Sequence, residues 1–158
     1  MNVEITIEDP TAPEVIAVLE RHLAFARAVT PEGGVFALDL EALGRPDVTF
    51  LCARADGRLL GVAALKELDQ QSVELKSMHT IEEARGKGVG RTLVVHALEL
   101  ARDRGYRCVN LETGNFDAFA PARDLYQSCG FAPCEPYGQY RESPTSACMT
   151  ISLDPPGP

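Results

Sequence analysis

The sequence lacks several features that would restrict its function directly. It has no tryptophan and 6% aromatic residues. No run of apolar residues approaches the ~18 that a membrane-spanning helix requires, so we predict no membrane partner. Lysine and arginine number 15 against 23 acidic residues, which gives a formal net charge of −8. A nucleic-acid partner is not expected either, because phosphate binding requires a basic surface.

The number and spacing of the cysteines also argue against two kinds of site. The five cysteines form no C-x-x-C pair and are odd in number, which argues against a zinc site and against a disulfide framework. Reduced thiols are typical of the cytoplasm, which is where we expect the protein. The first eight residues alternate apolar and polar side chains without a basic segment, so they predict a strand rather than a signal peptide.

The length of 158 residues suits one domain, residues 1–158, with one core. Thr11 and Glu14 have the spacing of a capping box at the start of a helix, and Asp56-Gly57 between two apolar runs is a hairpin signal. Strands are predicted over 1–8, 48–55, 59–67, 72–80, 108–112 and 147–153, and helices from 11 to before Pro31, at about 38–43, and over 88–104 and 121–128. This order predicts an α/β (α+β) fold in which a mixed, mostly antiparallel sheet of about six to seven strands has helices on both faces.

The most informative segment is the basic, glycine-rich run at residues 85–92, R-G-K-G-V-G-R-T, which follows a predicted strand and opens a helix. Glycines allow a sharp turn, and the unpaired N–H groups of the helix N-terminus attract anions, so the segment is typical of a phosphate site. It is not a P-loop, because Lys87 is followed by glycine. It is not a Rossmann fingerprint, because the spacing is G-x-G-x-G after an antiparallel meander. A turn without a ligand is the alternative.

Two motifs together resemble the GNAT superfamily of acetyl-CoA-dependent N-acetyltransferases. Arg85, Gly88 and Gly90 fill the R/Q-x-x-G-x-G/A signature, and residues 125–131, L-Y-Q-S-C-G-F, are similar to the L-Y-x-x-x-G-F signature. Residues 111–114, L-E-T-G, resemble the end of the fifth strand of that family. The resemblance implies the GNAT fold and an acyltransferase that uses acetyl-CoA as co-substrate and needs no metal.

The resemblance also implies roles for individual residues. In this family the loop holds the CoA pyrophosphate, and the preceding strand pairs with the pantetheine arm. A backbone N–H near Met78 would polarise the thioester carbonyl. Tyr126 would be the general acid that protonates the CoA thiolate, and Glu74 the general base. The implied cofactor-binding residues are Met78, His79, Thr80, Arg85, Gly86, Lys87, Gly88, Val89, Gly90, Arg91, Thr92, Asn115, Ala122 and Tyr126.

One departure concerns the segment before Tyr126. Many relatives carry an asparagine that contacts CoA where this sequence has Phe119, and Asn115 is close but offset. Whether Asn115 or Phe119 contacts CoA therefore stays open. His79 has two candidate roles, a proton relay or a contribution from its backbone alone, and His22 is expected to be a surface or packing residue.

The acceptor is expected to be a primary amine of a small molecule or peptide, bound between the first helix and the loop at residues 135–141. We also consider a homodimer. The alternative to an enzyme is an acyl-CoA-binding sensor or interaction domain with the same fold and little turnover.

Overall fold

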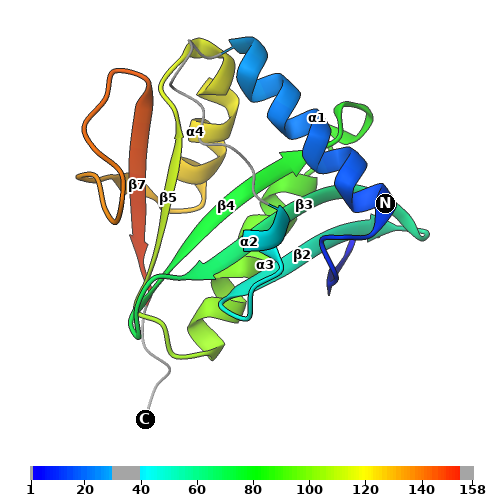
Figure 1. Ribbon diagram of the computed structural model, residues 1–158, viewed down its shortest axis with the longest axis horizontal. Helices are drawn as coiled ribbons and strands as arrows, with labels where there is room; N and C mark the ends of the chain where they lie inside the picture. Colours follow the sequence, from blue (N-terminus) through cyan, green and yellow to red (C-terminus); the bar gives the residue numbers. More distant parts are fainter. Residues whose placement is uncertain (1, 30–39, 154–158) are drawn as a thin grey trace.

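The computed structural model describes residues 2–29 and 40–153, which form a seven-stranded mixed sheet with helices on both faces (Figure 1). The strand order is β1-β2-β3-β4-β5-β7-β6, and β4 and β5 run parallel whereas the other neighbours are antiparallel. The strands are β1 (Glu4–Ile7), β2 (Val48–Ala55), β3 (Arg58–Glu67), β4 (Ser72–Thr80), β5 (Cys108–Gly114), β6 (Ala132–Pro133) and β7 (Ser146–Ser152).

Four α-helices and two 3-10 turns complete the described part of the chain: α1 (Pro13–Val29), α2 (Leu40–Leu43), η1 (Glu82–Ala84), α3 (Val89–Asp103), η2 (Asp117–Phe119) and α4 (Ala120–Ser128). The predicted α/β fold class is thereby confirmed. The predicted end of the first helix before Pro31, and the first two residues of the predicted turn at 38–43, lie outside the described residues. No helix within 2–29 or 40–153 is both long enough and apolar enough to span a bilayer.

The β2–β3 hairpin follows directly from its turn residues. Asp56 and Gly57 both have positive φ, 50° and 80°, as a two-residue type I′ turn requires. Helix α3 lies against the face of β3 at Gly61, where a Cβ would be 2.9 Å from the His79 carbonyl oxygen on β4, 3.2 Å from Leu93 and 3.3 Å from Val89. The glycine therefore allows the first turn of α3 to approach the sheet, and this contact fixes the position of the loop that precedes α3.

The two parallel strands separate halfway along their length. Their pairing covers residues 72–75 of β4 and 108–111 of β5, and Figure 1 shows the strands diverging beyond that point towards α1 and α4. The register between β3 and β4 shifts between Val62 and Ala64, and Ser77 in the same stretch has a φ of 57°. A bulge bends the strand that contains it, so the bulge at Ser77 directs the end of β4 away from β5 and leaves an opening in the sheet.

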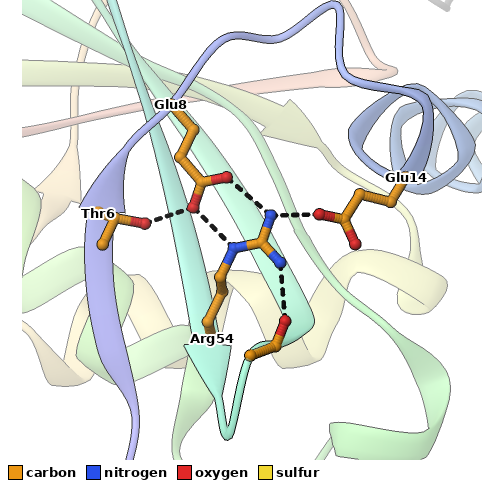
Figure 2. Close-up of polar contacts among 5 residues, drawn as sticks. Thr6, Glu8, Glu14 and Arg54 are labelled. Atoms are coloured by element: carbon orange, nitrogen blue, oxygen red, sulfur yellow. Dashed lines mark hydrogen bonds and ion pairs between the residues drawn. The ribbon is translucent and has the colours of Figure 1, made fainter.

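Arg54 anchors the start of α1 to the edge of the sheet (Figure 2). Its Nε and Nη2 donate to the two carboxylate oxygens of Glu8 at 2.7 Å each, Nη2 also donates to Glu14 on α1, and Nη1 donates to the Gly57 carbonyl at 2.9 Å. Thr6 donates a further hydrogen bond to Glu8. Bidentate arginine–carboxylate pairs are geometrically specific, so the network sets where α1 enters the fold.

The predicted capping box at Thr11 and Glu14 is wrong. The Ala12 carbonyl accepts the first helical bond, from the Ile16 N–H at 3.0 Å. The Thr11 hydroxyl instead donates to Asp9 Oδ1 at 2.7 Å, and Glu14 pairs with Arg54. A local Asx-type turn and a long-range ion pair have therefore replaced the two reciprocal hydrogen bonds that the spacing predicts.

Candidate active site

A cavity of about 680 Å³ occupies the opening between β4 and β5. Its walls come from α1, the bulged end of β4, the loop before α3, the end of β5, and η2 with α4. The residues that line it are His22, Phe25, Ala26, Ser77, Met78, His79, Thr80, Ala84, Arg85, Gly86, Gly88, Val89, Gly90, Arg91, Glu112, Thr113, Gly114, Ala118, Phe119, Pro121, Ala122, Leu125 and Tyr126.

The glycine-rich loop has the geometry of an anion site at one end of this cavity. Gly86 and Gly88 have φ values of 77° and 83°, and a Cβ at either would meet no atom within 4 Å. These glycines are therefore required by the backbone conformation and not by crowding. Gly88 immediately precedes α3, and the Thr92 N–H is bonded to the Gly88 carbonyl at 3.0 Å. The N–H groups before Thr92 have no carbonyl one turn back, so they are available to a ligand.

The basic side chains of the loop differ in their surroundings. Arg85 donates from Nε to the Thr80 carbonyl at 3.2 Å, and its guanidinium lies 5.8 Å from the centre of the Phe25 ring. Arg91 donates to Ser128 Oγ at 2.6 Å, which ties the first turn of α3 to α4. Both arginines line the cavity, which places two cations next to the unpaired N–H groups.

Two of the predicted loop residues are not part of the cavity wall. Lys87 and Thr92 are absent from the lining. The Thr92 hydroxyl donates to the Gly88 carbonyl at 2.9 Å, so it supports the loop conformation from within the helix. A direct contact of either side chain with CoA stays a prediction.

Tyr126 lines the cavity from α4. Its side chain is 6% exposed, and its ring packs edge-on against Phe131 at 5.9 Å between centroids. Among the described residues, no hydrogen bond contributes to the pKa of the Tyr126 hydroxyl. Burial raises the pKa of the phenol, so the hydroxyl keeps its proton at neutral pH, as a general acid must.

Glu74 is placed differently from what the predicted base role requires. It is 3% exposed and does not line the cavity. Its carboxylate accepts a hydrogen bond from the Tyr137 hydroxyl at 2.6 Å and lies 3.6 Å from Lys76 Nζ. The ring of Tyr137 packs edge-on against Tyr140 at 5.1 Å. The loop at 135–141 therefore covers Glu74 instead of leaving it open to an acceptor, and the base role of Glu74 stays a prediction.

Glu112 on β5 is a charged cavity residue to which sequence reasoning gave no role. It lines the cavity and accepts a hydrogen bond from Ser146 Oγ at 3.0 Å. Burial, with the charge of Glu74 nearby, raises the pKa of Glu112, although Lys76 and the Ser146 hydrogen bond act in the opposite direction. A carboxylate at this position can attract a cationic amine. The sequence signal that contains Glu112 is the motif at 111–114, which predicts only a strand end.

The helix α1 also contributes more than expected. His22, predicted to be a surface or packing residue, lines the cavity with Phe25. His22 Nδ1 lies 3.3 Å from Nδ1 of His79 on β4, and the ring centroids are 5.2 Å apart. Burial lowers the pKa of both imidazoles to about 4. The helical spacing of His22 and Phe25 was visible in the sequence, but not the surface that they face.

Two aromatic rings, Phe119 and Phe25, pack together at the segment before Tyr126. Phe119 lines the cavity, and its ring packs edge-on against Phe25 at 5.5 Å. Asn115 is exposed, absent from the cavity lining, and its backbone N–H donates to the Thr145 carbonyl at 3.1 Å. Gly114 is required here, because a Cβ would overlap the Phe119 ring. An apolar ring thus lines the cavity near the position of the family's asparagine.

Comparison with known proteins agrees with this architecture. Residues 15–131 match the model of the Acetyltransferase (GNAT) family. The chain is 42% identical over 149 residues to the uncharacterized N-acetyltransferase YsnE of Bacillus subtilis, covering 94% of this chain and 99% of that protein. It is 34% identical over 153 residues to the IAA acetyltransferase of Azospirillum brasilense, covering 96% and 99%.

Among solved structures, a putative acyl-CoA N-acyltransferase from Klebsiella pneumoniae superposes with a TM-score of 0.83 at 26% identity, covering 96% of this chain and 98% of that one. The family match spans more than half of the chain, and the relatives align over nearly their whole length. The protein belongs to the GNAT family of N-acetyltransferases.

Proposed function

We propose that residues 1–158 form one N-acetyltransferase domain that transfers the acetyl group of acetyl-CoA directly to a primary amine of a small molecule or peptide. One observation carries the proposal. The anion site at Gly86 and Gly88, the opening beside Met78, and the hydroxyl of Tyr126 all belong to one cavity. One cavity can therefore bind the pyrophosphate, polarise the thioester and protonate the leaving thiolate at the same time.

The donor side of the proposal uses the backbone more than side chains. The N–H groups at the start of α3 would bind the pyrophosphate, with Arg85 and Arg91 supplying positive charge. The end of β4 lacks a partner strand on the β5 side, so its N–H and C=O groups are available to the amides of the pantetheine arm. The Met78 N–H would hydrogen-bond the thioester carbonyl, where negative charge develops during attack.

The chemical step requires one proton to reach the leaving sulfur. The amine nitrogen forms a bond to the thioester carbon, the C–S bond then breaks, and Tyr126 would donate its phenolic proton to the CoA thiolate. The neutral amine loses one N–H proton as the amide forms, and this proton replaces the one that Tyr126 has lost. Glu74 is kept only as the alternative base, because the Tyr137 hydroxyl donates to its carboxylate and neither residue lines the cavity.

The acceptor class rests on charge. Glu112 places a carboxylate in the cavity wall, and an alkylamine is a cation at neutral pH, since its pKa is near the ~10.4 of lysine. The name of the relative from Azospirillum brasilense gives IAA as a substrate, so an acceptor panel includes IAA beside amines, amino acids and peptides. The alternative of an acyl-CoA-binding sensor has the same donor site and lacks turnover.

The donor site is tested by titration with acetyl-CoA, followed by calorimetry and thermal unfolding. At a free concentration of 100 times Kd, binding stabilises the folded state by about 2.7 kcal/mol, so the melting temperature rises. No heat of binding and no rise in melting temperature would contradict the proposal. Binding without accelerated CoA release by any acceptor of the panel would favour the sensor.

A further inference from the structure

We infer that His79 and His22 form a proton relay that removes the proton of the acceptor ammonium group and delivers it to solvent at α1. The inference rests on the proposed function, and it concerns two side chains that come from different elements. His79 follows the bulge of β4 and is 7% exposed. His22 is partly buried on α1, and both residues line the cavity.

The contact between the rings determines their protonation. A distance of 3.3 Å between the two Nδ1 atoms is a hydrogen bond only if one Nδ1 carries a proton and the other does not. In a neutral imidazole the proton is on one nitrogen alone. The ring that donates through Nδ1 therefore has a free lone pair on Nε2, and its partner carries a proton on Nε2. One Nε2 of the pair can therefore accept a proton, and the other Nε2 can donate one.

The surroundings keep both rings neutral at pH 7, so the nitrogen that accepts the proton starts without one. Burial lowers the pKa of each imidazole to about 4. The neighbouring groups His22 and Arg21 from α1 and Arg85 from the loop after β4 lower the pKa of His79 further, because each would repel a protonated ring when it carries its own positive charge. Arg21 is itself paired with Glu83 at 3.4 Å. At neutral pH the basic Nε2 is thus unprotonated in essentially every molecule.

The protons balance across one turnover. The ammonium N–H bond breaks as His79 Nε2 takes the proton, the Nδ1 proton of His79 passes to His22 Nδ1, and His22 releases its Nε2 proton to water. The amine is then neutral and can attack the thioester. Exchange with water after product release returns both rings to their starting tautomers. The net result is one proton released for each amide formed, as the reaction of an ammonium ion with a thioester requires.

The contact with His22 changes the chemistry of His79. A lone buried imidazole that accepts a proton becomes an unsolvated cation, which is unfavourable. A second ring within hydrogen-bond distance shares that charge and leads it towards the surface. His22 is thus a positioning and relay residue, and His79 is the group that would touch the acceptor.

The contact between the two rings can be tested without an acceptor. The chain has three histidines, so the NMR signal of each ring can be assigned. Nitrogen-15 NMR of labelled protein, with CoA bound, reports the tautomer of each ring, and His22→Gln, His79→Gln and His96→Gln assign the signals. We expect one neutral Nδ1–H ring and one neutral Nε2–H ring for His22 and His79 at pH 7. Two rings of the same tautomer, or a protonated ring at pH 7, would overturn the inference.

Kinetics test the relay itself, with the primary amine that reacts fastest in the acceptor panel. His79→Gln is expected to lower kcat by about 10²-fold at neutral pH, the usual size of a general-base contribution, with unchanged affinity for acetyl-CoA. His22→Gln is expected to lower kcat by a smaller factor. His96→Gln, on α3 and outside the cavity lining, is the matched control. Both deficits should shrink by about tenfold per pH unit as the free amine forms.

Three results distinguish failure of the relay from failure of the function. A deficit of His79→Gln that is the same at every pH would overturn the relay, because the lost step would not be deprotonation. A Glu74→Gln variant that shows the pH-dependent deficit while His79→Gln does not would assign the base to Glu74 instead. Wild-type protein inactive with every acceptor would contradict the proposed function, and the NMR experiment would still decide the tautomers.

Discussion

Replacing Tyr126 with phenylalanine removes one oxygen atom from the active site and leaves the ring in place. The side chain is 6% exposed and packs against Phe131, and both contacts belong to the ring. Because no hydrogen bond from a described residue contributes to the pKa of this hydroxyl, its loss is expected to leave no unpaired group behind. The free energy of unfolding should therefore change by less than about 0.5 kcal/mol.

The effect on catalysis is expected to be much larger. A general acid contributes roughly 10²-fold or more to turnover, and a factor of 10² corresponds to about 2.7 kcal/mol of activation free energy. The deficit of Tyr126→Phe should be smaller for an acyl donor with a more acidic thiol, because that thiolate leaves without a proton. Because burial raises the pKa of Tyr126, the acid form persists above the ordinary tyrosine pKa of about 10.

Steady-state kinetics at varied acetyl-CoA concentration separate the three roles of Tyr126. A fall in kcat with unchanged KM for acetyl-CoA supports the acid role. A raised KM with unchanged kcat would identify a binding contact, and no change in either constant would identify a packing residue. The last two results would refute the reasoning, as would an equal deficit for every leaving thiol.

Three further substitutions test other parts of the account. Gly88→Asp should remove most CoA affinity with little loss of fold by circular dichroism, since its charge would oppose the pyrophosphate; Gly88→Asn, which also tolerates a φ of 83°, is the uncharged control. Gly114→Ala should weaken acetyl-CoA binding in calorimetry, because its Cβ would overlap the Phe119 ring, and adding Phe119→Ala should restore part of it. Arg54→Met should lower the free energy of unfolding in urea by about 2 kcal/mol. Because Arg54 lowers the pKa of Glu8, this difference should be complete above the unfolded-state pKa of about 4.3 and disappear as the pH falls through the lower folded-state value.

Each of these expectations has a contrary result. Equal loss of CoA affinity in Gly88→Asp and Gly88→Asn would show that the loss comes from the left-handed backbone at this position and not from charge. If the effects of Gly114→Ala and Phe119→Ala on acetyl-CoA binding simply add in the double mutant, the two positions are independent. A stability difference for Arg54→Met that persists unchanged into strong acid would mean that the Glu8 carboxylate is not its source.

Local patterns predicted the elements well where a buried apolar run is bounded by turn residues. Residues 48–55 and 72–80 were predicted as strands with the observed bounds, because apolar runs and turn residues act over short distances. The sharp turn predicted from the glycines of residues 85–92 is also present, with Gly88 at a φ of 83°. The capping box failed because Arg54, forty residues away along the chain, takes Glu14.

The acceptor side of the site could not be predicted in the same way. His22, Glu112 and Phe119 meet in one cavity although they belong to α1, β5 and η2, and no local pattern determines which helix face meets which strand end. Glu74 shows the reverse case. Its position on β4 favoured a catalytic base, but the loop at 135–141 buries it under Tyr137, a contact between distant parts of the chain.

The most direct test of the account is mass spectrometry of the acceptor after incubation with acetyl-CoA, with free CoA thiol measured in the same sample. The account predicts an amine that gains one acetyl group on nitrogen, with one equivalent of CoA released per amide formed, and a product that forms far more slowly with Tyr126→Phe. CoA release without an acetylated nitrogen, or tight acetyl-CoA binding with no acetylated product from any acceptor, would contradict it.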